Sequence, residues 1–288
     1  MPNILYPPPR PQSVGEILDS AFRIFRATLL KCLPYATVAV IAGQLPALYN
    51  MARGRPLLPP EPINDLLSWV LNTWVRQMRD PLWWAASLIV TVLGSAILLR
   101  QHAVATGRPT AASVDLATAV RRLPGVLALL ILSGLAVAIW VLPAFALHGS
   151  MRYLLLLLLL APASCVAIAL SCGWPVLLVT GKGALASMIH STRLTWGSWW
   201  HLTLIYSVAA VLLVALYALA GVIALVLSVL LAHGDIAVVT AVTTVTMLIV
   251  AGIGTPFFWA LALAVLGDLT VRREGADLAQ RLSAPATQ

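Results

Sequence analysis

Apolar residues in this chain fall into six long blocks separated by short polar segments. The blocks cover residues 33–48, 82–99, 126–147, 153–180, 200–231 and 236–266. An α-helix needs roughly 20 such residues to cross the hydrocarbon core of a bilayer. The pattern therefore predicts an all-α, polytopic membrane bundle of about six transmembrane helices.

Three polar segments with helical character precede the odd-numbered spans, at residues 13–30, 113–123 and 183–196. The first opens with Ser13 and has Glu16 three residues later, which is the spacing of a capping box. We expect these segments to be amphipathic helices at the membrane surface. Another is expected in the outer loop, from Ile63 to Met78.

A short repeated motif links the three inner segments. Residues 20–23, 118–121 and 190–193 can be aligned so that each ends in an arginine. The alignment predicts three units, each an interfacial helix followed by a transmembrane hairpin. It also makes the arginines candidate contacts for lipid or for a protein partner; they are Arg23, Arg121 and Arg193.

The domain organisation follows from the same pattern. Residues 1–12 are a proline-rich cytoplasmic tail, residues 13–272 a single membrane domain, and residues 273–288 a second cytoplasmic tail. Charged residues make up only 10% of the chain, against about 25% in a soluble domain. A soluble fold is therefore excluded.

The orientation is predicted by the distribution of the 18 basic residues. With the N-terminus inside, thirteen fall on inner segments and five on outer ones, as the positive-inside rule requires. The inner ones are Arg10, Arg23, Arg26, Lys31, Arg100, Arg108, Arg121, Arg122, Lys182, Arg193, Arg272, Arg273 and Arg281. Both termini are then cytoplasmic. The net charge of +8 lies beside the membrane, where it favours anionic lipid rather than nucleic acid.

Carboxylates are missing from most of the predicted membrane region. The chain has no Asp or Glu between Pro81 and Val114, or between Leu116 and Gly234. Ion-coupled transporters usually bury a carboxylate in the membrane. The exception is Asp268, four residues before Arg272, which we interpret as an ion pair at a helix end. A role in ion coupling stays open as the alternative.

No motif for catalysis, phosphate binding or metal coordination is present, so neither an enzyme nor a cofactor is expected. Helix breakers are the more informative residues. Pro162 and Pro175 interrupt the fourth span, and Pro256 interrupts the sixth. Such breaks free carbonyl groups that bind substrate in transporters, although a kink that serves only packing is the simpler interpretation.

Small residues recur at a spacing of four in two spans. The pairs are Gly134 with Ala138, and Ala220 with Ala224. This spacing lets membrane helices approach closely, so we expect both pairs to lie in helix–helix contacts.

Three stretches resemble an uncharacterised bacterial group of multi-pass proteins. They are residues 13–23 (SVGEILDSAFR), residues 183–200 around Gly183-Ala184-Leu185 and Gly197-Ser198-Trp199-Trp200, and residues 268–278 (DLTVRREGADL). The group includes YciC-like proteins and the membrane domain of some glycerophosphoryl diester phosphodiesterases. The resemblance implies a helical fold of about six spans in the bacterial inner membrane. It brings no catalytic residues, and the chain lacks the tyrosine that precedes the closing motif in typical members.

The sequence favours a non-enzymatic scaffold or accessory subunit of an envelope complex, with a membrane-protein partner or a homo-oligomer. Two alternatives stay open. One is a transporter or flippase for a lipid or other amphiphile, and the other is a membrane-embedded enzyme that acts on lipid head groups.

Overall fold

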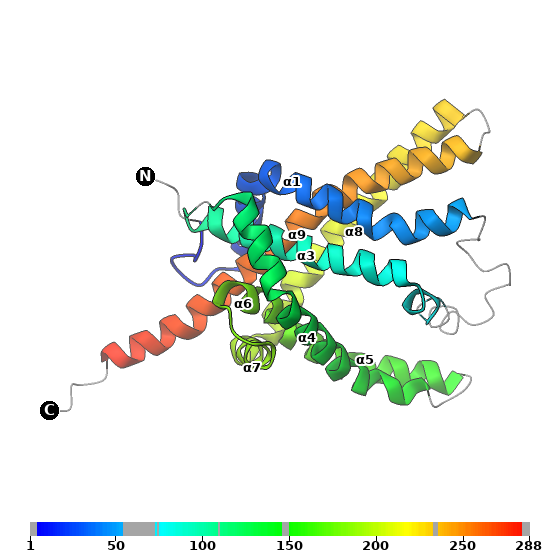
Figure 1. Cartoon of the computed structure of the whole chain (residues 1–288). Coiled ribbons are helices and arrows are strands. Elements are labelled where there is room, and N and C mark those ends of the chain that lie inside the picture. Colours follow the sequence, from blue (N-terminus) through cyan, green and yellow to red (C-terminus); the bar gives the residue numbers. More distant parts are fainter. Residues whose placement is uncertain are drawn as a thin grey trace.

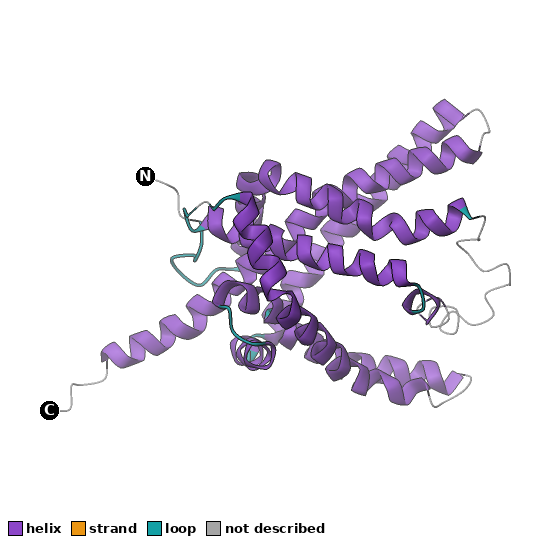
Figure 2. Ribbon diagram, in the orientation of Figure 1, coloured by secondary structure: helices purple, strands orange, loops and turns teal. Residues whose placement is uncertain are grey.

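The computed structural model describes residues 5–53, 73, 75–108, 110–145, 150–232 and 236–283, and helix is the only regular structure in them (Figure 2). Six stretches are long and apolar enough to cross a membrane. The prediction of a helical bundle with six spans is confirmed. The helices are α1 (Val14–Ala52), α3 (Pro81–Ala105), α4 (Ala112–Phe145), α5 (Ser150–Leu170), α6 (Gly173–Thr180), α7 (Ala184–Thr195), α8 (Trp199–Ala232) and α9 (Ile236–Ser283).

Helix α1 begins at the predicted capping box. The Ser13 N–H donates to the Glu16 carboxylate at 2.8 Å, and the Glu16 N–H donates to Ser13 Oγ at 3.4 Å. The helix then continues through Pro34 and Pro46 into the first span. The expected interfacial helix is therefore the first part of α1 and not a separate element.

Only the third of the expected interfacial helices is separate. Helix α4 runs through Pro124 into the membrane, whereas α7 is isolated by Gly181 and Gly197, whose φ angles are +72° and +80°. Left-handed glycines of this kind end a helix and turn the chain. The outer helix expected from Ile63 to Met78 falls mostly outside the described residues.

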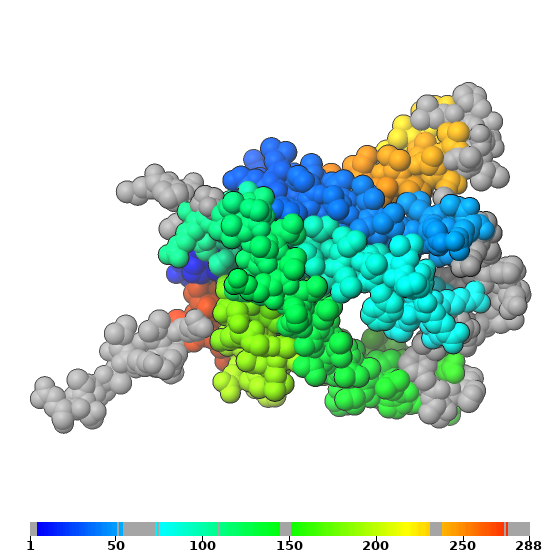
Figure 3. All heavy atoms as spheres, in the orientation of Figure 1, coloured from blue at the N-terminus to red at the C-terminus, as the bar shows by residue number. Residues whose placement is uncertain are grey.

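Three hairpins build the molecule: α1 with α3, α4 with α5, and α8 with α9 (Figure 1). They meet at one end, which we call the base and define as residues 5–13, 105–112, 180–199 and 267–273. The N–H groups of Leu5 and Tyr6 donate to Ala105 O there, at 2.8 and 3.2 Å. From the base the hairpins diverge, and we call their distal halves the arms. Figure 3 shows the ends of the arms standing apart.

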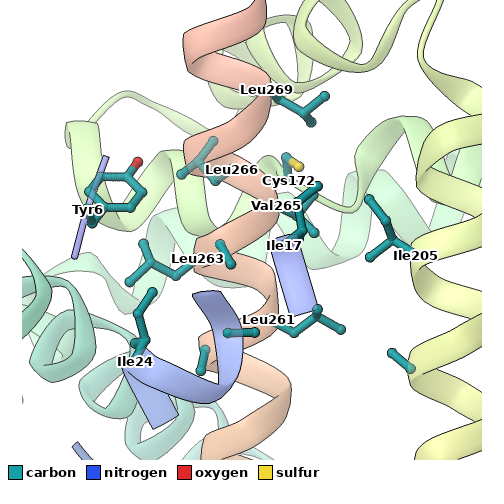
Figure 4. Close-up of a cluster of buried hydrophobic side chains, with 14 of the residues drawn as sticks. Tyr6, Ile17, Ile24, Cys172, Ile205, Leu261, Leu263, Val265, Leu266 and Leu269 are labelled. Carbon is teal, nitrogen blue, oxygen red and sulfur yellow. The ribbon is translucent and has the colours of Figure 1, made fainter. Parts of the chain in front are cut away.

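The packed core lies between α1, α3, α6, α8 and α9, toward the base. Ile17 and Ile24 of α1 and Leu263 and Leu269 of α9 are at most 1% exposed (Figure 4). A second cluster joins α3, α6 and α9, where the Trp174 and Trp259 rings lie edge to face at 4.8 Å. Because helix α9 contributes buried residues to both clusters, it is the central helix of the fold.

The arms leave most of their apolar surface uncovered. In the most apolar part of the α9 span 61% of the residues are buried, against 6% for the span at residues 151–180 and 11% for that of α8. Apolar side chains in a bilayer lose nothing by facing lipid. The uncovered arms are therefore stable in a membrane and would not be stable in water.

The two pairs of small residues differ in their surroundings. Ala220 and Ala224 are 2% and 1% exposed, as expected for close packing in the α8/α9 arm. Gly134 of α4 is exposed, and a Cβ atom there would meet nothing within 4 Å. The contact that we expected at Gly134 is not made within the described chain.

Of the two spans that contain Pro162, Pro175 and Pro256, only the fourth is broken, and the break lies before Pro175. Helix α5 continues through Pro162, and α9 continues through Pro256, because one lost hydrogen bond can be absorbed as a kink. The fourth span breaks at Ser171 and Cys172. Pro175 follows as the third residue of α6, where its missing N–H breaks no intrahelical bond.

Candidate functional site at the base

The most connected polar group of the base is the Asp268 carboxylate, which is 1% exposed. Arg272 Nε donates to its Oδ2 at 2.6 Å, and the backbone N–H of Gln12 donates to its Oδ1 at 2.7 Å. His201 Nε2 lies 3.7 Å from Oδ2. The expected pair of Asp268 with Arg272 is thus present, but it lies inside α9, which continues to Ser283, and not at a helix end. His201 is a third member that the sequence pattern did not indicate.

This Asp268 cluster fastens the N-terminal segment to α9. Arg272 also donates to Gln12 O, and Gln12 Nε2 donates to Ser20 Oγ of α1 at 2.9 Å. The Gln12 N–H therefore occupies Oδ1 of the carboxylate, and Arg272 of α9 occupies Oδ2. A His, an Asp and an Arg converge as they do in many active sites, but here backbone atoms of the chain itself hold the position that a substrate would need.

A close contact between Tyr6 and Gly267 completes this attachment. A Cβ atom on Gly267 would lie 2.8 Å from Tyr6 Cε2 and 3.0 Å from Pro8 Cδ. The Tyr6 ring also meets the His102 ring edge to face at 5.2 Å. Residues 5–12, expected as a tail, are folded onto the base.

A second buried ion pair joins α3 to α4. Arg100 donates to Asp115 Oδ2 at 3.1 Å, and the Asp115 side chain is 5% exposed. Arg100 also donates to Thr110 O. The pair closes the short connection between the first and second hairpins, and removing one partner of such a pair costs more than forming it contributes.

The break in the fourth span is filled by helix α7. Ala169 O loses its intrahelical partner at the break, and it accepts hydrogen bonds from Ser191 Oγ at 2.7 Å and Thr195 Oγ1 at 3.3 Å. Tyr206 of α8 donates to Ser171 Oγ at 3.0 Å. Two polar groups that the broken helix could offer to a substrate, Ala169 O and Ser171 Oγ, are therefore bonded to neighbouring helices.

The three arginines of the repeated motif lie on different surfaces. Arg23 donates to Ser20 Oγ at 3.3 Å, Arg121 is exposed on α4, and Arg193 lines a depression on α7. The small residue two positions before each arginine is fully buried in all three motifs, at Ala21, Ala119 and Ser191. The motifs therefore share a local environment, although no described interaction joins the arginines into one site.

Arg122, the neighbour of Arg121, has a structural role that the sequence analysis missed. Its guanidinium donates to Leu177 O at 3.4 Å and to Leu178 O. These carbonyls lie in the last turn of α6, which ends at Gly181. Leu177 O also accepts from the Gly181 N–H at 2.9 Å, so Arg122 adds a donor at the C-terminal end of the helix, where basic side chains are favourable. The adjacent basic pair in the sequence gave no sign of which arginine would do this.

Comparison with known proteins adds no assignment: no family model, no curated protein and no solved structure matches the chain. The resemblance based on three short motifs stays a prediction. All three motifs begin at the base, at the start of α1, at α7 with the start of α8, and at the Asp268 end of α9.

Proposed function

We propose that the protein is a non-enzymatic membrane scaffold or accessory subunit that receives transmembrane helices of a partner between its arms. The observation that carries this proposal is the divergence of three hairpins from one packed base (Figures 1 and 3). Each arm offers apolar surface on several sides, and exposed Gly134 offers a small residue with open space in front of it.

The polar groups of the described residues favour a scaffold over the alternatives. The two buried carboxylates, Asp115 and Asp268, are both in ion pairs at the base. The carbonyl of Pro256 also has a side-chain partner, since it accepts from the buried Gln101 Nε2 at 2.7 Å. A rigid base that holds three arms apart is suited to organising other helices.

Substitution of Gly134 by leucine tests the proposal. The new side chain meets open space within the chain, so the thermal unfolding of the purified protein should stay the same. A partner helix packed on this face would be displaced, and the amount of co-purified partner should fall several-fold. Gly275→Leu is the matched control, because Gly275 also meets open space but lies beyond the base.

A photo-crosslinking residue at Ile139, which is 68% exposed on α4, gives an independent measurement in native membranes. A defined protein adduct that is lost in Gly134→Leu supports the scaffold. Recovery of lipid adducts alone, with no stable protein partner, contradicts it. Transfer of labelled lipid between leaflets of reconstituted vesicles would instead favour the transport alternative.

A further inference from the structure

Helix α7 carries a shallow depression of about 270 Å³ on its outer face. The residues that line it follow one side of the helix at intervals of three or four: Lys182, Ala186, Ile189, His190 and Arg193. Figure 3 shows this helix, in yellow-green, at the surface of the base. Three of the five side chains are cationic or can become so.

The positive charge of this depression comes from Lys182 and Arg193. Lys182 and Arg193 are exposed, and neither takes part in an ion pair with the carboxylates that the structure places, whereas Arg100 and Arg272 do. The sequence around them has no carboxylate from residue 117 to residue 233. The N-cap Gly183 also leaves the start of α7 without a side-chain cap, which adds partial positive charge beside Lys182.

The two faces of α7 are arranged as in a helix that lies at a membrane surface. Its inner face carries three hydroxyl side chains and one leucine, since Ser187 and Ser191 are fully buried, Thr195 is 4% exposed and Leu194 is 3% exposed. Its outer face is apolar beside the cations, with Leu185 at 62% and Ile189 at 45% exposed. Trp196 and Trp200 follow at 79% and 77%, and exposed tryptophans mark the head-group level of a bilayer.

We propose that this depression binds the phosphate group of an anionic phospholipid. The Arg193 guanidinium presents a fork of N–H donors that matches phosphate oxygens, and Lys182 supplies a second positive charge. Ile189, Leu185 and the tryptophans contact the lipid beside its head group. The volume is slightly below the range of small-molecule pockets, which suits a phosphate with its glycerol. This inference does not depend on the partner proposed for the arms.

Lipid titration of the delipidated protein, followed by native mass spectrometry in detergent, tests the site. Wild-type protein should retain phosphatidylglycerol in preference to phosphatidylcholine. The double substitution Lys182→Ala with Arg193→Ala should weaken phosphatidylglycerol binding about 25-fold, since each of the two basic residues near a membrane contributes about a fivefold effect. Phosphatidylcholine binding should stay within about twofold of wild type, because its net charge is zero.

Arg121→Ala is the matched control, because Arg121 holds the same motif position but lies outside the depression. It should change binding less than twofold. Ile189→Asp places a negative charge in the depression and should also abolish the preference for phosphatidylglycerol. Equal binding by wild type and the double variant overturns the proposal. Inorganic phosphate that binds as tightly as the lipid would overturn it as well, because the ligand would then be a soluble anion.

Discussion

At the residue scale, Asp268 has the largest effect on how the base is assembled. Its carboxylate receives one donor from α9 and one from the N-terminal segment, at distances below 2.8 Å. The remaining polar atoms of Gln12 bind Arg272 and Ser20. One buried side chain therefore holds together segments that are 256 residues apart.

Substitution of Asp268 by alanine should destabilise the protein by about 3 kcal/mol, because it leaves Arg272 and the Gln12 N–H without their buried partner. The loss can be measured as lower thermal stability in detergent, followed by tryptophan fluorescence. The N-terminal segment should also become sensitive to protease.

Arg10→Ala is the control for this prediction. Arg10 pairs with Glu16 at 2.8 Å, but its side chain is 75% exposed, and exposed pairs contribute at most about 1 kcal/mol. Equal melting temperatures of Asp268→Ala and Arg10→Ala would show that the Asp268 cluster does not hold the N-terminal segment on the base.

The residues also show where reasoning from the sequence succeeds. The Ser13–Glu16 capping box and the Asp268–Arg272 pair depend on neighbours three and four positions apart, so local spacing reveals them. His201 and Gln12 reach Asp268 only through tertiary packing. No regular spacing in the sequence predicts such contacts, so the sequence analysis did not identify His201 or Gln12 as partners of Asp268.

At the scale of elements, α7 is the part that gives the fourth span its shape. The chain leaves the helix at Ser171 and Cys172, and a carbonyl left unpaired at membrane depth would cost several kcal/mol. Two hydroxyl groups on one face of α7 bind that carbonyl. Helix α7 therefore stabilises the break in the fourth span by binding the carbonyl group that the break leaves unpaired.

The double substitution Ser191→Ala with Thr195→Val should cost about 1–3 kcal/mol, because it keeps the shape of α7 but leaves Ala169 O unsatisfied. Thermal unfolding in detergent measures the effect. Thr192→Val provides the comparison on the same helix, since its hydroxyl binds only Ile189 O within α7 and should contribute less than 1 kcal/mol. Equal melting temperatures of the two variants would show that the hydroxyl groups of α7 do not stabilise the break.

Prolines were a poor guide to this break for a physical reason. A proline costs a helix one hydrogen bond, and continuous packing on both sides restores the helix beyond it. Pro162 and Pro256 are passed in this way. The glycines with positive φ, Gly181 and Gly197, are the true ends of elements here, and nothing in the sequence separates them from the helical Gly125 or Gly134.

At the scale of the whole molecule, the chain forms three hairpins on one base. Hydrophobic block length predicted the six spans because bilayer thickness imposes it. The length of the apolar blocks could not predict that the arms diverge, because the side chains are equally apolar whether they face lipid or another helix. Only the burial of each side chain in the assembled structure distinguishes the residues that face lipid from those that face another helix.

The base should lie on the cytoplasmic side, because it carries six of the thirteen inner basic residues, including Lys182 and Arg193 on or beside α7, and none of the five outer ones. Alkaline phosphatase fused after Arg53, three residues beyond the end of the first span at Asn50, should be active outside the membrane. A green fluorescent protein at the C-terminus should fluoresce inside. The reverse pattern in both fusions would invert the orientation, and a mixed pattern would contradict the even number of spans.

The 256-residue separation between Gln12 and its partner Asp268 also sets an order for biosynthesis. At about 5–20 residues per second, a ribosome makes Asp268 about 10–50 s after Gln12. During that interval each hairpin can enter the bilayer by itself, and the first segment of the chain can bind Ala105 O of α3 but not yet Asp268. Completion of α9 then closes the base. A nascent chain that stops before α9 would expose its N-terminal segment, and a membrane protease could use this signal to distinguish an unfinished protein from a finished one.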